Sequence, residues 1–232
     1  MGLGRAVHPL THDTTRRWRA ATARGILIVV GRAVSFLIAE DDELVGRVLV
    51  RTLSEHGRTE LVTTAEGARS ALRSRSFNAV IVDVGLPDGS GLDVITDARS
   101  HDPSVGALVV SGGVDERRLA EAHNLGAHYL LKPVDTRQLG LFAVRLRSKV
   151  RQREAKIAAL IGRWAVEYQL TTAEADILAL AVEGAARSRL AELRGVAPST
   201  VKKQVQVILT KTGDGSLEAA VSRLLRAIVD EG

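Results

Sequence analysis

The chain has 232 residues, of which 45% are hydrophobic and 25% charged, and its formal net charge is +5. This length predicts two small domains, each able to bury its own core, and the composition excludes collagen-like and disordered chains. The absence of cysteine excludes disulfides and thiolate metal sites, and fits a reducing cytoplasm. Apolar runs fall well short of the roughly 18 residues that span a bilayer, so we expect a cytoplasmic protein and no membrane partner.

The charges are distributed unevenly along the chain. Residues 1–32 carry six Arg against Asp13, whereas residues 33–135 carry 10 basic and 16 acidic residues. Residues 136–169 then carry eight basic and two acidic residues, and the window 187–211 contains six basic residues and one acid. A local basic patch of this kind is typical of proteins that contact nucleic acid.

The first 32 residues are expected to form a basic, poorly ordered N-terminal extension. Their apolar part, residues 25–30, has only six residues and is soon followed by Arg32, so a signal peptide is disfavoured. The alternatives for this segment are an arm that contacts DNA and a start that lies upstream of the native one.

From residue 34 onward, short β-rich runs alternate with amphipathic segments. We predict strands over 34–39, 61–63, 79–82, 107–110 and 129–131. The helical patterns cover about 42–56, 65–75, 90–101 and 115–125, and a fifth helix should begin near 135 or 136. Gly57 and Gly126 stand where left-handed helix stops are expected. Parallel neighbours need helical crossovers, so this alternation predicts an α/β domain at 33–148 with a doubly wound, five-stranded parallel sheet.

The fifth helix has no clear stop in the sequence. Apolar residues continue along it at spacings of three and four, namely Leu139, Phe142, Leu146, Val150, Ile157, Leu160 and Trp164. We expect residues 149–168 to form a linker helix that packs first on the sheet and then on the next domain. A dimerising coiled-coil seam is the alternative interpretation.

Residues 169–232 contain no strand signal and predict a second, small all-α domain. Thr171 and Glu174 have the spacing of a capping box at the start of its first helix. Further helices are expected at about 187–194, 198–210 and 216–229, separated by Gly195 and by the segment "TGDGS".

Polar side chains stand just past several of the predicted strands. In open parallel sheets such positions meet at the carboxyl edge, where ligands bind. They are Glu40 and Asp41 after the first strand, Asp83 after the third, Ser111 after the fourth and Lys132 after the fifth. Clustered carboxylates repel one another, and Mg2+ relieves this repulsion because it prefers oxygen ligands. Taken alone, the Glu-Asp-Asp run is also explained as favourable charge at a helix start.

Asp83 is the predicted nucleophile of this edge. A carboxylate can attack a metal-bound phosphoryl donor to form an aspartyl phosphate, while Ser111 and Lys132 supply a donor and a positive charge to the phosphoryl oxygens. The simpler interpretation is that Asp83 is a solvated turn acid, since the "PDG" that follows is a turn signal by itself.

Residues 33–135 resemble the flavodoxin-like receiver domain of two-component response regulators across its full length. The segments that carry the resemblance are "FLIAEDDELV", "VIVDVGLPDGSGLDVI", "LVVSGG" and "GAHYLLKPVD". The resemblance implies that Asp83 accepts the phosphoryl group, that Asp41 binds Mg2+ directly and that Glu40 acts partly through water. It further implies that Ser111 and Lys132 contact the phosphoryl oxygens and that Tyr129 changes rotamer with Ser111. The Lys132–Pro133 bond is expected to be cis.

Two positions depart from the commonest pattern of this family. Glu40 replaces the more usual aspartate. Gly85 offers only its backbone carbonyl to the metal, and its missing side chain affects how far water reaches the phosphoryl group and hence how long that group survives.

The segment "LAELRGVAPSTVKKQVQVIL", together with the Leu-Thr-x-x-Glu opening at residue 170, resembles the LuxR-type helix-turn-helix of the NarL group. The resemblance implies that the helix from Pro198 enters the major groove of DNA. The residues in its first turns are Thr200, Val201, Lys202, Lys203 and Gln204. The two lysines could bind phosphate or guanine, Gln204 could contact adenine and Val201 could contact a thymine methyl. The alternative interpretation is that these residues form a solvated basic face of the helix. Ala197 stands where Ser or Asp often caps the recognition helix, and this lowers local stability by about 1 kcal/mol. The segment "GAARSRLA" is also unlike the usual polar turn before the scaffold helix.

These features predict a response regulator, not an enzyme in its own right. Its expected partners are a histidine kinase or phosphotransfer protein, double-stranded DNA, and a second copy of the chain when it is phosphorylated. A phosphatase of the haloacid-dehalogenase type is disfavoured, because Gly85 occupies the place of its second acid. The remaining alternative is a protein that binds a partner or acts as a phosphate sink without productive DNA binding.

Overall fold

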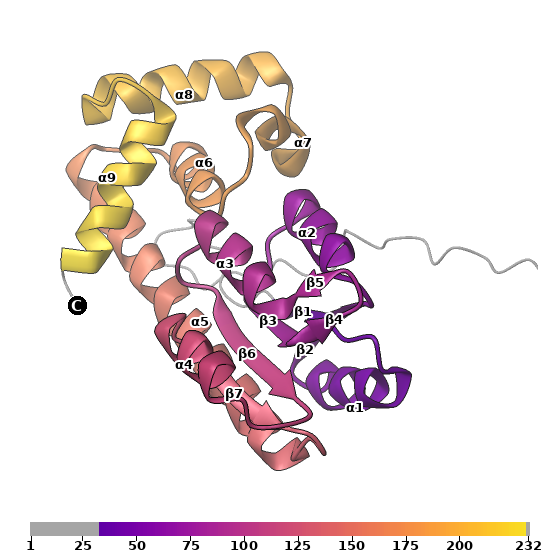
Figure 1. Cartoon of the computed structure of the whole chain (residues 1–232). Helices are drawn as coiled ribbons and strands as arrows, with labels where there is room; N and C mark the ends of the chain where they lie inside the picture. Colours follow the sequence, from indigo (N-terminus) through magenta and orange to yellow (C-terminus); the bar gives the residue numbers. More distant parts are fainter. Residues whose placement is uncertain (1–32, 231–232) are drawn as a thin grey trace, which may run out of the picture. The chain divides into compact units, whose positions relative to one another are not determined.

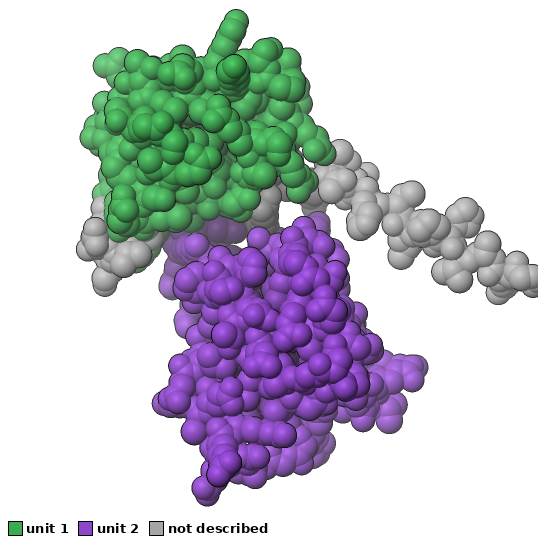
Figure 2. All heavy atoms as spheres, turned by 45° about the horizontal axis from the view of Figure 1, so that its top comes forward, with its two compact units in different colours: residues 1–30, 156–232 green, residues 31–155 purple. Residues whose placement is uncertain are grey.

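The computed structural model describes residues 33–230 (Figure 1), so the predicted basic extension lies outside the described residues. Within this range the chain separates between Ala155 and Lys156 into two compact units (Figure 2). We call residues 33–155, which are purple and labelled unit 2 in Figure 2, the first unit, and residues 156–230, which are green and labelled unit 1, the second unit. Among the helices of residues 33–230, none is long and apolar enough to cross a membrane.

The first unit is built on a parallel sheet with the strand order β2-β1-β3-β6-β7. Its strands are β1 (Val34–Ala39), β2 (Gly57–Val62), β3 (Ala79–Asp83), β6 (Gly106–Ser111) and β7 (His128–Leu131). Its helices are α1 (Glu43–Ser54), α2 (Ala65–Ser74), α3 (Gly91–His101), α4 (Glu116–Asn124) and the first part of α5 (Thr136–Glu167). This strand order is that of the flavodoxin-like doubly wound fold, so the predicted fold class is confirmed.

Both faces of the sheet are covered, which explains why its strands read as nearly continuous apolar runs. One core joins alternate strand residues such as Leu37 and Val80 to side chains of α2 and α3. The other joins Phe36 and Ile81 to side chains of α1 and to Leu139 of α5. The strands are therefore anchored on both sides, and their carboxyl ends are held at one edge.

The second strand and its neighbouring turn differ from the prediction. β2 begins at Gly57, four residues before the predicted start at residue 61. It is an edge strand with a half-exposed, polar sequence, so hydropathy shows only its last residues. Gly57 is therefore not a helix stop: it pairs with Val34, and a Cβ there would lie 2.1 Å from the Val34 carbonyl oxygen. The stop predicted at Gly126 is confirmed by its φ of +59°.

The long helix α5 runs without a break from Thr136 to Glu167. Leu139, Phe142 and Leu146 are buried in the core of the first unit, whereas Leu160 and Trp164 are buried in the core of the second. The side chains of Leu139, Phe142, Leu146, Leu160 and Trp164 thus pack within the chain, and Val150 and Ile157 are partly buried against the same two cores. This packing favours the linker-helix interpretation over a dimerising seam made by these residues.

The second unit is entirely helical within the described residues. It contains α6 (Thr172–Val182), a 3-10 turn (Arg187–Arg189), α7 (Leu190–Arg194), α8 (Pro198–Thr212) and α9 (Leu217–Asp230). The capping box of Thr171 and Glu174 is confirmed, with both reciprocal hydrogen bonds present. Gly195 ends α7 in the left-handed conformation, with a φ of 61°. The predicted helix 187–194 is instead a 3-10 turn followed by one short α-helix.

Candidate functional site

An acidic cluster lies at the carboxyl edge of the sheet in the first unit. Glu40 and Asp41 follow β1, and Asp83 ends the neighbouring strand β3. One oxygen of each carboxylate lies within 4.8 Å of the others. Parallel pairing of β1 and β3 brings the three acids together, although Asp83 is 43 and 42 residues from Glu40 and Asp41 in sequence.

Lys132, which follows β7, neutralises part of this charge. Its Nζ donates to Glu40 Oε1 at 2.8 Å and to Asp83 Oδ2 at 2.7 Å. Burial raises the pKa of Glu40, because desolvation of its carboxylate outweighs the stabilising hydrogen bond from Lys132. Burial alone would lower the pKa of Lys132, but its bonds to Asp83 and Glu40 outweigh that effect and raise it. The ammonium therefore stays charged between the two acids.

The second oxygen of Glu40 is the feature that fits a cation. Glu40 is only 1% exposed, and its Oε2 is buried without a hydrogen-bond partner among the described residues. A buried carboxylate oxygen without a partner is costly. Asp41 is exposed, so the cluster is open to solvent and leaves room for the water ligands that Mg2+ retains. The donor set is all oxygen and therefore fits Mg2+.

Asp42 has a different role from its two neighbours. Its carboxylate accepts hydrogen bonds from the backbone N–H groups of Leu44 and Val45, which makes it the N-cap of α1. The two explanations of the Glu-Asp-Asp run thus apply to different residues. Asp42 caps the helix, while Glu40 and Asp41 face the cluster with Asp83.

Ser111 and Tyr129 share one backbone acceptor. Ser111 lies at the end of β6, is 5% exposed, and its Oγ donates to the Gly113 carbonyl at 2.9 Å. The Tyr129 hydroxyl donates to the same carbonyl at 3.1 Å. The Ser111 hydrogen therefore points to the backbone, and any turn of Ser111 toward Asp83 frees an acceptor that Tyr129 also uses. The predicted cis bond between Lys132 and Pro133 is present.

Gly85 leaves one side of the acceptor uncovered. It is exposed, its N–H donates to Asp83 Oδ1 at 3.2 Å, and a Cβ built on it would have no heavy atom within 4 Å. The space beside Asp83 is thus open to a phosphoryl donor and to water.

Residues 36–142 match the family model of the response regulator receiver domain. This part of the chain is a receiver domain. The chain is 30% identical over 105 residues to the transcriptional regulatory protein CitT of Bacillus subtilis, which covers 44% of this chain and 46% of CitT. It is 27% identical over 192 residues to the DNA-binding transcriptional activator DevR/DosR of Mycobacterium tuberculosis, covering 78% of this chain and 88% of that protein. The chain thus spans about half of CitT but most of DevR/DosR.

Solved structures include a CheY-like response regulator receiver domain protein from Methanospirillum hungatei. It is 25% identical, has a TM-score of 0.48, and covers 53% of this chain and 98% of its own. With the receiver domain assigned, the helices that follow it fit a helix-turn-helix output domain. CitT and DevR/DosR are both named as proteins that regulate transcription.

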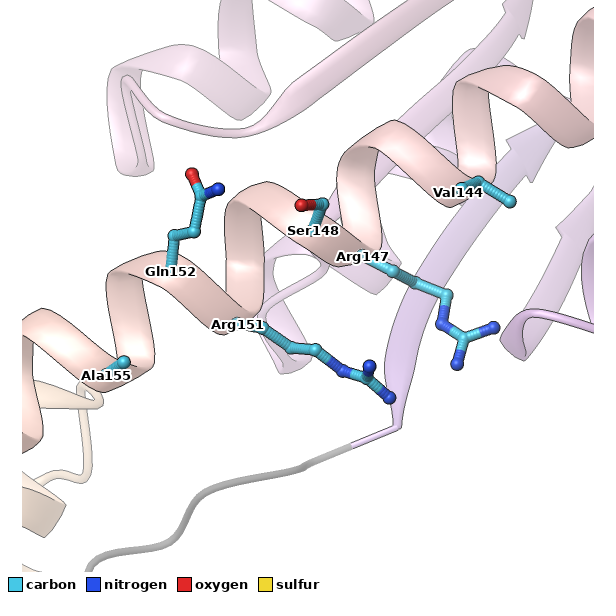
Figure 3. A pocket seen from close by; sticks show the side chains of 6 residues that line it. All are labelled: Val144, Arg147, Ser148, Arg151, Gln152 and Ala155. Atoms are coloured by element: carbon cyan, nitrogen blue, oxygen red, sulfur yellow. The ribbon is translucent and has the colours of Figure 1, made fainter.

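A groove of about 470 Å³ lies along α5 in the receiver domain unit (Figure 3). None of its lining residues belongs to the acidic cluster. Its lining residues are Val144, Arg147, Ser148, Arg151, Gln152 and Ala155. In Figure 3 the side chains of Arg147 and Arg151 extend on the same side of the helix. The groove is basic and contains no carboxylate, so it does not contribute to the candidate metal site.

The residues predicted to read DNA do not share one face of α8. Thr200, Lys202 and Lys203 are exposed. Val201 is only 4% exposed and packs in the helical core, so the expectation that it contacts a thymine methyl is wrong. The Gln204 side-chain oxygen accepts a hydrogen bond of 3.2 Å from Arg194, which also donates to the Ala173 carbonyl.

Two further outward-facing residues of α8 were missed by the sequence prediction. Gln206 is exposed, and Val207 is 40% exposed although it is apolar. Both follow Lys203 by three and four positions, which is the spacing of one helical face. That spacing was the available signal for finding them.

Proposed function

We propose that this chain is a two-component response regulator that accepts a phosphoryl group on Asp83 and controls transcription through DNA binding by its second unit. The observation that carries the proposal is the Asp83 carboxylate beside Lys132, in a cluster where one buried Glu40 oxygen has no hydrogen-bond partner within residues 33–230. Its expected partners are a histidine kinase or phosphotransfer protein, double-stranded DNA and a second copy of the phosphorylated chain.

The acceptor reaction follows from these groups. An Asp83 carboxylate oxygen forms a bond to the phosphorus of the donor, and the bond from phosphorus to the donor's leaving group breaks, with the electron pair remaining on that group. Glu40, Asp41, Asp83 and the Gly85 carbonyl would hold Mg2+, which reduces the repulsion between the carboxylate and the incoming anion. Lys132 gives up its hydrogen bond to Asp83 and donates to a phosphoryl oxygen instead.

Ser111 completes the binding of the phosphoryl group. Its hydroxyl turns from the Gly113 carbonyl to a phosphoryl oxygen, and the Tyr129 hydroxyl then holds that carbonyl alone or moves with Ser111. A local charge change at Asp83 is thereby converted into a rearrangement of the loop after β6.

DNA binding is proposed for the outward face of α8. Thr200, Lys202, Lys203, Gln206 and Val207 make up this face, which we call the α8 outer face. It combines two cations for phosphate, one amide and one apolar side chain for base edges. Val201 and Gln204 support the helix from its inner side.

The acceptor is tested with acetyl phosphate as the donor. The wild-type chain should become phosphorylated only with Mg2+, and Asp83→Asn should abolish the modification, as measured by intact mass and by the release of phosphate with hydroxylamine. Asp93→Asn is the matched control, because Asp93 is an exposed acid of α3 outside the cluster. Equal labelling of Asp83→Asn and wild type would place the acceptor elsewhere. Phosphorylation without any DNA binding would favour the phosphate-sink alternative.

A further inference from the structure

A short hairpin follows the acceptor and is fastened to a helix far from it in sequence. The hairpin consists of β4 (Gly85–Leu86) and β5 (Gly89–Ser90), joined through Pro87 and Asp88. At its tip, Asp88 Oδ1 accepts from the Ala65 N–H at 2.6 Å, and Asp88 Oδ2 accepts from the Glu66 N–H at 2.9 Å. Both N–H groups open α2, 22 and 23 residues before Asp88.

Asp88 therefore shares the capping of α2 with that helix's own N-cap. The Thr64 side chain accepts from the Gly67 N–H, at 3.0 Å, and the two preceding N–H groups donate to Asp88 instead. A carboxylate at a helix N-terminus also has favourable electrostatics. Consistent with this geometry, the hydrogen bonds from Glu66 and Ala65 lower the pKa of Asp88.

The hairpin has few other attachments. Each strand has two residues, and hairpins of this size are not stable alone. Leu86 is buried in the core beneath it, and the Gly91 N–H donates to the Val84 carbonyl at 3.1 Å. The two hydrogen bonds of Asp88 are the side-chain bonds in the described structure that tie the tip of the hairpin to the rest of the domain.

We propose that Asp88 is a positioning residue for the phosphoryl acceptor, holding the hairpin so that the Gly85 carbonyl and the Asp83 carboxylate present oxygens to the same cation. This inference rests on the proposed function of Asp83. Asp88 itself binds no ligand: it acts through the backbone that follows Asp83, as supporting residues around metal ligands do.

The test compares two variants that each remove caps from the same helix end. Asp88→Ala should weaken Mg2+ binding by about tenfold, the lower end of the effect seen when residues that orient metal ligands are removed. Thr64→Ala removes a cap of α2 without touching the hairpin, so its Mg2+ affinity should equal that of the wild type. Affinity is measured by titrating the full chain with MgCl2 and following the backbone amide resonances of residues 83–85 by NMR.

Asp88→Asn extends the comparison, because it keeps one acceptor oxygen and should give an intermediate affinity. It also decides the matter if Asp88→Ala does not fold. Thermal denaturation of each variant shows whether helix capping is lost to a similar extent. Equal Mg2+ affinity of the Asp88 and Thr64 variants would overturn the inference. If the wild type itself neither binds Mg2+ nor is phosphorylated at Asp83, the proposed function fails instead.

Discussion

Glu40 illustrates how a single residue departs from the family pattern and still suits its place. Its longer side chain lets Oε1 accept both from Lys132 and from the backbone N–H of Asp42, at 2.8 and 3.2 Å. The other oxygen stays buried and unpaired among the described residues. Glu40 therefore depends on a nearby cation, which Lys132 supplies in this structure.

Removal of that cation should be costly. Lys132→Ala is expected to lower the free energy of unfolding by about 3 kcal/mol at neutral pH, because it leaves a buried carboxylate without its counterion. Mg2+ should then raise the melting temperature of the variant more than that of the wild type, because the ion restores positive charge. Thermal denaturation with and without Mg2+ measures both effects.

The control for this prediction is Arg47→Ala, which breaks an ion pair with Glu43 on the exposed side of α1. An exposed pair of this kind contributes less than about 1 kcal/mol. Similar losses in the Arg47 and Lys132 variants would contradict the role assigned to Lys132.

The helix α8 has two faces with different roles, one packed in the core of its unit and one exposed. Val201, Val205 and Ile208 are buried at spacings of three and four, and they attach the helix to its unit. The α8 outer face lies opposite these residues. Basic side chains near the start of the helix are thus separated from the residues that hold it.

This division predicts different effects on DNA binding. Lys203→Ala should weaken binding to all sequences alike and reduce the magnitude of the salt slope by about one unit, since one phosphate contact is lost. Gln206→Ala should relax preference at one base pair, at a cost of about 1–3 kcal/mol. Binding is measured against ionic strength, on sites obtained by mapping bound genomic DNA after phosphorylation.

Gln204→Ala is the matched control for Gln206→Ala, because the same side chain is engaged with Arg194 inside the unit. It should lower stability and leave the base preference unchanged. If Gln204→Ala changed the base preference and Gln206→Ala did not, base recognition would belong to Gln204 and not to the α8 outer face.

At the scale of the whole molecule, the two units have separate cores, and the second is held together by a cluster around Arg223. This side chain donates to both oxygens of Asp214, at 3.1 and 2.8 Å, and to the Tyr168 hydroxyl at 2.9 Å. Its guanidinium lies 4.2 Å from the ring centroid of Trp164. Arg223 thereby joins α9 to the end of α5 and to the loop after α8.

Loss of this cluster should destabilise the second unit alone. Arg223→Ala is expected to lower the free energy of unfolding of that unit by about 1.5–3 kcal/mol, the range for hydrogen bonds to charged groups. The bonds from Arg223 lower the pKa of Asp214 below its ordinary value of 3.8. Its contribution is therefore complete above that value and is lost as pH falls through the lower, folded-state pKa.

Amide hydrogen exchange, read separately for residues 33–155 and 156–230, measures the Arg223 effect. Acid titration of wild type and Arg223→Ala should show a smaller acid-induced loss in the variant, because Asp214 no longer has its partner. Equal destabilisation of both units would mean that they do not unfold separately.

The sequence was sufficient to predict the five strands of the parallel sheet and the helices between them, the capping box at Thr171, and the position of Glu40, Asp83, Ser111 and Lys132 at or just after strand ends. These features depend on local periodicity and on residue types within a few positions. It also determined which segments resemble the receiver domain. It failed for the start of β2, since pairing along an edge strand is made by the backbone and leaves polar residues such as Arg58 in a strand.

The contacts between side chains of different elements could not be predicted from the sequence. Lys132 donates a hydrogen bond to Glu40, which is 92 residues away in sequence. Asp88 caps α2, which precedes it in the chain, and Arg194 donates a hydrogen bond to the side-chain oxygen of Gln204. Burial of Val201, by contrast, could have been predicted, because Val201, Val205 and Ile208 recur at the helical spacings of four and three residues. The contacts between elements depend on how the elements pack around a core. Strand order and helix rotation decide which side chains become neighbours, and distance along the chain does not.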